Sequence, residues 1–548
     1  MGSLSEVPIL SLILASPLLG LLVLLCLPKH RTRWLQTTAI AATLLPLLFS
    51  LWLYVDYNKT QGSESYPESY TWMDVPLNHE TQEGVQAYRL VFDYSLAVDG
   101  LSLPLVLLTT LVTAMAALAS IHIRKRWQSF YAWFLLLEFG MLGVFLARDL
   151  LLFFVFFELT LIPMFFLIGI WGYGNREKAA NKFLLYNGVG SALMLIAFVI
   201  LINMAGFRLE QTAEQVQFIY SGSYEVIQQN LSNPEAWVNL SPAQTNGMNP
   251  WHMSEGMSWT IFLLLLAAFG IKLPIFPFHT WMLKVHTEAP PSVVMIHSGI
   301  LLKMGAYGLL RFGILLFPEQ AREWAGVLAV LGVINVLYGA VLALVQKEFK
   351  LVLAYSSISH MGIVLLGIAS LNEIGMGGAV FQLVSHGFVS ALLFLVVGSL
   401  YERTGTTELQ ELGGLARSLP FLSGILLAAG MASLGLPGLS GFIGEFLSIL
   451  GLFESMRWLG AAAVIGVIIT AVYILRSVLG ITFGPISERH SALKDARLIE
   501  AVPMIVLLAF IILLGIYPSI LMDVIQLHMG DLYQDIIAGM GGGMNHGG

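Results

Sequence analysis

Four ionisable residues lie inside apolar stretches long enough to cross a bilayer: Glu158, Lys272, Lys303 and Glu445. A charged side chain at bilayer depth costs roughly 2.5–3.5 kcal/mol on insertion scales, so a membrane helix does not carry one for stability. Acids and lysines at that depth are typical of ion or proton pathways. The four residues therefore predict a transport function.

The acids also have explanations that need no transport. Glu158 follows Phe153-Phe-Val-Phe-Phe, where it could be a neutral carboxylic acid hydrogen-bonded to a carbonyl. Glu445 follows a Gly-rich segment and could cap the helix that starts there. Glu138, in a neighbouring apolar stretch, is a weaker companion of Glu158. The transport interpretation requires a cation close to Glu158.

The two lysines lie deep in their apolar stretches. Buried lysine can lose and regain a proton during a working cycle, whereas arginine cannot. The alternative is that each side chain extends to the membrane surface, which the central position of Lys272 beside a proline argues against. If Glu158 and Lys272 were about 6 Å apart, an effective dielectric constant near 20 would give roughly 2–3 kcal/mol of attraction.

Histidines provide a possible relay between these charges. His360 follows Tyr355-Ser-Ser, and His386 lies four residues after Gln382 on the same helix face. Histidine titrates near neutral pH and suits proton transfer, although each could instead be a satisfied core residue. Three others lie near the ends of two apolar stretches, where a proton entrance and simple packing are equally possible: His279, His286 and His297.

Composition places the chain among polytopic membrane proteins. Charged residues make up 11% and hydrophobic residues 57% of 548 residues, and the mean hydropathy is +0.79, whereas soluble domains are about 25% charged. A net charge of −7 predicts no nucleic-acid partner. The single cysteine, Cys26, the absence of metal-ligand spacing and the absence of phosphate-loop, flavin or nicotinamide motifs predict no metal and no cofactor in this chain. If the chain transports ions or protons, we therefore expect partner proteins to supply the energy.

A span of about 20 apolar residues crosses the hydrocarbon, and this criterion predicts an all-α polytopic membrane protein with about fourteen transmembrane helices. No basic segment or cleavage site precedes the first span, so we expect it to be retained. The predicted spans are 8–28, 34–56, 98–121, 128–147, 149–171, 178–205, 257–284, 288–313, 324–345, 351–371, 374–402, 419–454, 457–481 and 499–522.

Basic residues alternate from loop to loop, which predicts the orientation. Loops that follow odd-numbered spans carry Lys and Arg and are expected to be cytoplasmic. The long loops 57–97 and 206–256 and both termini would then be outside. The basic loops include Lys29, Arg31 and Arg33; Arg124, Lys125 and Arg126; Arg176, Lys178 and Lys182; Lys347 and Lys350; Arg403 and Arg417; and Arg476, Arg489, Lys494 and Arg497.

Spans seven and twelve are interrupted by glycine and proline, at 270–279 and 435–445. Broken helices at corresponding places point to inverted repeats with ion sites at the breaks. We therefore expect two inverted five-helix repeats. The expected regions are 1–127, with three helices and an external loop; 128–313, the first half-channel repeat; 324–481, the second half-channel repeat; and 482–548, the last helix and tail.

The segments around these charges resemble a known family. Gly270-Ile-Lys-Leu-Pro-Ile-Phe-Pro-Phe-His-Thr-Trp281, Leu301-Leu-Lys-Met-Gly305 and Ala354-Tyr-Ser-Ser-Ile-Ser-His-Met-Gly362 look like the M subunit of bacterial NADH–quinone oxidoreductase, respiratory complex I (chain 4 in mitochondria). The resemblance extends over about residues 90–525. It implies an antiporter-like fold of fourteen helices with two inverted repeats, of which helices 7 and 12 are broken.

The resemblance also implies a role for each buried group. An acid at position 445 favours the M type, because the related L-type, N-type and antiporter subunits usually carry lysine there. The segment Met282-Leu-Lys-Val-His286 departs from the Leu-Pro-Asp-Ala-His of many relatives and alters the charge at the entrance. The implied roles are acid and base of the first half-channel for Glu158 and Lys272, connecting lysine for Lys303, central relay for His360 and His386, and exit residue for Glu445.

The function implied is outward proton translocation across the bacterial plasma membrane, coupled to electron transfer to quinone in partner subunits. The chain would be a translocase subunit without a redox centre, beside L-type and N-type subunits in the lipid bilayer. NADH, FMN, iron–sulfur clusters and quinone would bind the partners. The alternatives are a secondary Na⁺/H⁺ antiporter subunit, a related complex linked to ferredoxin, F420 or hydrogenase modules, and a structural anchor with vestigial charges.

Overall fold

The structure is a computed structural model that describes residues 7–60, 62, 66–78, 87–123, 125–211, 216–245, 249–485, 488–527 and 529–530. Within these residues, 13 helices are long and apolar enough to cross a membrane. The remaining predicted span, the twelfth, is divided between two shorter helices, α16 (Pro420–Ser433) and α17 (Ser440–Ser455). The predicted loop residue Arg124 and the chain ends lie outside the described residues.

The helix boundaries follow the hydropathy prediction closely. The last helix ends at Ile516, whereas the predicted last span extends to residue 522. The helices before the first repeat are α1 (Ile9–Cys26), α2 (Thr32–Lys59) and α3 (Ser102–Ala119). The first repeat comprises α4 (Trp127–Leu146), α5 (Leu150–Leu159), α6 (Leu161–Trp171), α7 (Arg176–Met204), α9 (Glu255–Lys272), α10 (Thr280–Glu288), α11 (Pro291–Ile296), η3 (His297–Leu301), α12 (Leu302–Gly308) and η4 (Leu309–Ile314). The rest are α13 (Pro318–Val345), α14 (Phe349–Ala369), α15 (Glu373–Thr404), α16, α17, α18 (Arg457–Thr482) and α19 (Leu498–Ile516).

The two predicted helix breaks are present. After α9 the chain leaves helical geometry at Leu273, and the side chain of Asn335 satisfies the break by accepting from Phe276 N at 2.8 Å and donating to Pro274 O at 3.3 Å. Between α16 and α17, Gly435 and Gly438 adopt φ values of +77° and +92°, which glycine tolerates best. The expected broken helices in both repeats are therefore confirmed.

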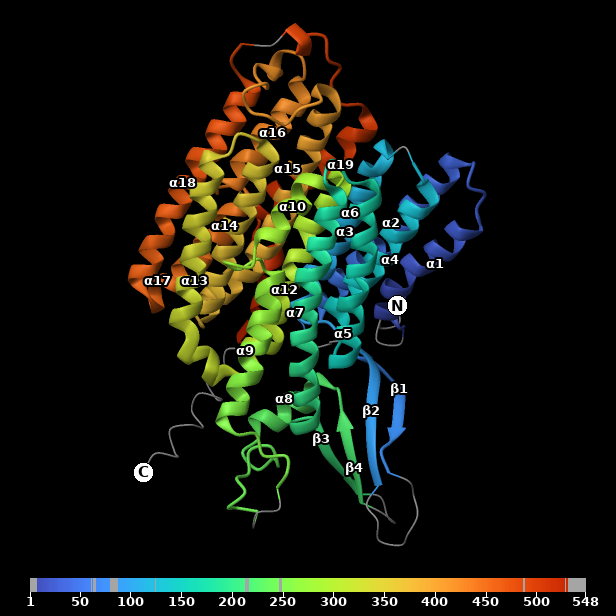
Figure 1. Ribbon diagram of the computed structural model, residues 1–548, viewed down its shortest axis with the longest axis vertical. Coiled ribbons are helices and arrows are strands. Elements are labelled where there is room, and N and C mark those ends of the chain that lie inside the picture. The colour runs from blue at the N-terminus through green and yellow to red at the C-terminus, as the bar shows by residue number, and fades with distance from the viewer. Residues whose placement is uncertain are drawn as a thin grey trace.

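A four-stranded sheet lies at one end of the helices, together with α8 (Tyr224–Ser232) (Figure 1). We call this the sheet end. Its strand order is β1-β2-β4-β3, with β2 parallel to β4 and the other pairs antiparallel. The strands are β1 (Glu68–Pro76), β2 (Ala87–Leu96), β3 (Phe207–Gln211) and β4 (Val216–Ser221). The sheet thus joins the two long loops, to which the sequence assigned no structure.

At the opposite end, the loops that carry most of the basic residues pack together, and we call this the basic end. Tyr173 N donates to Glu288 O at 2.6 Å, and Phe349 N donates to Thr407 O at 2.8 Å. The two broken helices enter from opposite ends: α9 follows the sheet-end segment, whereas α16 begins where Phe421 N donates to the Asp495 carboxylate at 2.6 Å. This arrangement is the inversion expected of the repeats.

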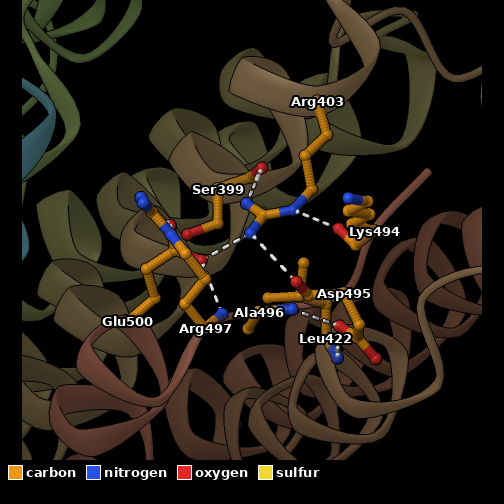
Figure 2. Close-up of polar contacts among 8 residues, drawn as sticks. All are labelled: Ser399, Arg403, Leu422, Lys494, Asp495, Ala496, Arg497 and Glu500. Atoms are coloured by element: carbon orange, nitrogen blue, oxygen red, sulfur yellow. Dashed lines mark hydrogen bonds and ion pairs between the residues drawn. The ribbon is translucent and has the colours of Figure 1, made fainter.

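Arg403, near the end of α15, connects several segments at the basic end of the second repeat (Figure 2). Its guanidinium donates to Ser399 O at 3.0 Å, Lys494 O at 2.9 Å and Asp495 O at 3.4 Å, and pairs with Glu500 in α19 at 2.5 Å. The side chain of Glu500 is only 3% exposed. Arg403 therefore ties α15 to α19 through charged and backbone contacts.

We expect Arg403→Met to lower the free energy of unfolding by about 3 kcal/mol, because it removes a largely enclosed cation from the buried Glu500 carboxylate. Thermal or chemical denaturation of the purified chain measures the change. Arg497→Met is the matched control: Arg497 also pairs with Glu500 but its side chain is 68% exposed, so a loss below about 1 kcal/mol is expected. Equal losses in the two variants contradict the explanation.

Candidate functional site

A row of four buried side chains connects α12 with α14, α15 and α17. Lys303 Nζ donates to Ser298 O and lies 2.8 Å from His386 Nδ1. The rings of His386 and His360 have centroids 5.3 Å apart, and His360 Nδ1 lies 3.0 Å from Glu445 Oε1. All four residues are at most 5% exposed. The structure thus brings four predicted residues into one continuous series of contacts, which we call the central row.

Each member of the central row comes from a different helix. Lys303 lies in α12, between the π-helical segments η3 and η4, and π-helical turns are frequent at functional sites. His360 and His386 lie in α14 and α15, and Glu445 in α17. The first repeat supplies Lys303 and the second supplies the rest. The row therefore depends on the packing of one repeat against the other.

Close packing around Glu445 requires small residues. A Cβ atom at Gly435 would lie 2.8 Å from Glu445 Oε2, and one at Gly444 would lie 2.4 Å from Gln382 Oε1. Ser433 Oγ lies 3.4 Å from His360 Nε2. The glycines of the broken helix therefore do more than interrupt it, because they let the acid of α17 reach the histidine of α14.

Lys272 and Glu158 lie in the first repeat and interact electrostatically without a direct ion pair. Lys272 is 2% exposed, and its Nζ has no hydrogen-bond partner among the described residues. It lies over the rings of Phe157 at 4.8 Å and Phe183 at 5.7 Å. Glu158, near the end of α5, likewise has an unpartnered Oε1. The cation that Glu158 requires is therefore present, although the two groups do not touch.

A histidine pair lies between the two lysines, and sequence reasoning did not identify it. His286 Nε2 and His297 Nδ1 are 2.9 Å apart, and both residues are fully buried. His297 interacts electrostatically with Lys272 and Lys303, and His286 with Lys303. His279, by contrast, packs its ring against Tyr338 at 5.1 Å. His286 and His297 thus form a buried pair, whereas His279 lies apart from them against Tyr338.

Glu138 is not part of the central row. It is fully buried in α4, and neither of its carboxylate oxygens has a hydrogen-bond partner among the described residues. A buried carboxyl group without a partner carries a large desolvation cost if ionised. Its geometry alone does not connect it with Glu158 or Lys272.

A cavity of about 570 Å³ opens at the basic end, close to the break of α9 and α10. Lys350, at its wall, lies 5.0 Å from the ring of Tyr173 and 4.6 Å from that of Tyr401. Lys182 Nζ donates to Thr280 O at 3.3 Å on the side nearer the first repeat. This cavity opens toward the basic end beside α10.

Taken together, these groups could hold and pass protons. The buried series consists of lysines, histidines and carboxylic acids, each of which can change protonation state, and it contains no arginine. Among the residues that the structure describes, no group of three or more His, Cys, Asp or Glu could hold a metal ion.

A family model described as "NADH:quinone oxidoreductase/Mrp antiporter, TM" matches residues 147–470. The chain is 36% identical to NADH-quinone oxidoreductase subunit M of Rhodobacter capsulatus over 92% of this chain and 91% of the relative. A chain of respiratory complex I from Thermus thermophilus has a similar structure, with a TM-score of 0.77 and 30% identity over 96% of this chain and 99% of that one. A chain of the Mrp complex from a Dietzia species, 22% identical with a TM-score of 0.77 over 97% of this chain and 99% of that one, shares the fold.

Proposed function

Since this chain belongs to the M-subunit family of NADH-quinone oxidoreductase, we propose that it translocates protons across the membrane through the buried groups of its two repeats. The central row from Lys303 to Glu445 is the observation that carries the proposal. A row of titratable groups in contact suits a subunit that moves protons while its partners transfer electrons.

In this proposal, region 128–313 takes up protons and region 324–481 releases them. Protons enter from the cavity at the basic end and reach Lys272, whose charge Glu158 stabilises. The pair of His286 and His297 connects Lys272 with Lys303. The central row then delivers the proton to Glu445 for release at the sheet end.

The energy must come from partner subunits. Moving one charge against 100 mV costs about 2.3 kcal/mol, and we assign no energy-yielding cofactor to this chain. We propose that NADH, FMN, iron–sulfur clusters and quinone bind elsewhere in the complex, and that L-type and N-type subunits flank this one. The basic end would face the cytoplasm of a bacterial plasma membrane, and both termini would be outside.

Lys272→Ala tests the proposal. We expect loss of most proton translocation, because the variant removes the ammonium between the entrance cavity and the histidine pair. The measurement is acidification of proteoliposomes that contain the complete complex during NADH oxidation, with quinone reduction followed in parallel. Lys178→Ala, at an exposed site on α7, is the matched control. Wild-type pumping and quinone reduction in Lys272→Ala would refute the proposal and favour a structural anchor.

The second candidate is a secondary Na⁺/H⁺ antiporter subunit. The shared fold with the Mrp complex chain is the observation that favours it. It predicts that an imposed Na⁺ gradient drives proton flux in proteoliposomes without NADH and quinone. Proton pumping that requires electron transfer and is independent of Na⁺ excludes this candidate.

A further inference from the structure

Two arginines share one buried acid at the sheet end of the first repeat. Asp99 Oδ2 lies 2.5 Å from Arg148 Nη2 and 2.5 Å from Arg311 Nη2. The three side chains are at most 8% exposed. Two guanidinium groups around one carboxylate give this arginine cluster a net charge of +1, and arginine does not release its proton in proteins.

The arginine cluster joins several elements of the first repeat. Asp99 Oδ1 accepts from Leu101 N at 3.0 Å and Ser102 N at 2.9 Å, at the start of α3. Arg148 lies between α4 and α5, and its N–H donates to Ser95 O at the end of β2 at 2.8 Å. Arg311 lies in η4, eight residues after Lys303 of the central row. The cluster thus lies on the sheet side of the proton-exchanging groups.

An aromatic layer separates the arginine cluster from Lys272. The layer begins at Phe157, whose ring lies against Lys272. The ring centroids of Phe157 and Phe269 are 6.3 Å apart, and those of Phe269 and Phe312 are 6.1 Å apart. The ring of Phe312 lies 5.9 Å from that of Tyr224, over which the Arg311 guanidinium lies at 5.4 Å. Two more rings complete the layer beside Phe312: Phe153 at 4.7 Å and Phe198 at 5.0 Å.

The packing of this layer depends on glycine. A Cβ atom at Gly308 would come within 2.1 Å of the Phe269 ring, so the helix backbone approaches the ring directly. Among the described residues, the rings of this layer include no carboxylate, histidine or lysine. Between Lys272 and the arginine cluster a proton therefore meets no acid, histidine or lysine, and the one ionisable ring of the layer is Tyr224, which lies next to Arg311.

We propose that the aromatic layer and the arginine cluster form a two-part seal that closes the sheet end of the first repeat to protons. The rings place no acid, histidine or lysine between Lys272 and the arginine cluster, and the net positive charge of the cluster repels a cation, as arginine does in water-selective pores. Sealing this exit sends each proton along the central row to Glu445 in the second repeat. This inference rests on the proposed function, because a seal matters only in a chain that conducts protons.

The experiment measures passive proton permeability of proteoliposomes that hold the complete complex, after an acid pulse and without NADH. One positive charge removed at about 10 Å from the path, at an effective dielectric constant near 20, corresponds to about a tenfold change in permeability. We expect this increase for Arg311→Met. We expect none for Arg311→Lys, which keeps the charge, and none for Asp99→Asn, which leaves the two arginines.

If the arginine cluster only held the helices together, Asp99→Asn and Arg311→Met would both disturb the packing and raise the proton permeability equally. Equal leaks in these two variants, or no leak in Arg311→Met, would overturn the inference. If Arg311→Met does not assemble, Arg148→Met provides the same test at the other arginine. Lys272→Ala separates the seal from the proposed function, because it is expected to stop pumping while the proteoliposomes remain tight to protons.

Discussion

Lys303→Met is expected to abolish proton translocation while the complex still assembles. Methionine matches the length and apolar stem of lysine, so the fully buried site remains filled. It removes the Nζ group that contacts both Ser298 O and His386 Nδ1. Because positioned proton transfer contributes about a hundredfold or more to a rate, we expect a loss of that order in proton flux per NADH oxidised.

Two further variants show whether proton exchange or charge matters at this position. Lys303→Arg keeps a cation that does not release its proton, so we expect it to pump as poorly as Lys303→Met. Lys347→Met removes a lysine from an exposed site at the basic end and is expected to pump normally. Normal pumping by Lys303→Arg would mean that the site contributes a fixed charge and not a proton.

The membrane architecture could be predicted from the sequence because its physical cause is local. Each span must satisfy its backbone within one helix, so hydropathy and length suffice to find it. The breaks were visible for the same reason: Pro274 cannot donate to a helix ladder, and Gly435 and Gly438 favour the left-handed backbone that the structure contains.

The features that sequence reasoning missed depend on contacts between distant segments. The β2–β4 pairing joins residues 87–91 with 217–221, and no local pattern indicates which loop pairs with which. His286 and His297 were noted individually, but their contact arises from the turn between α10 and α11. The arginine cluster was missed because Arg148 lies between two predicted spans, and Asp99 and Arg311 lie at the ends of predicted spans 98–121 and 288–313, where the sequence alone does not show that they are buried together.

The central row requires both repeats. Its lysine comes from the last span of the first repeat, and its histidines and acid come from the second. Neither repeat alone supplies the whole row. A change in the packing between α12 and α15 would separate Lys303 from His386. In the proposed function, partner subunits could control proton transfer by moving these two helices relative to each other.

Glu445→Gln is expected to stop proton release with little effect on folding. Glutamine has nearly the same shape, so the close contact with Gly435 is retained, but the amide cannot take a proton from His360, whose Nδ1 lies 3.0 Å from Glu445 Oε1. We expect proton flux to fall by about a hundredfold, measured as acidification of proteoliposomes during NADH oxidation. Glu454→Gln, at an exposed site on the same helix, is the matched control. If Glu445→Gln pumps at the rate of this control, the acid serves only to cap α17 and the proton leaves by another group.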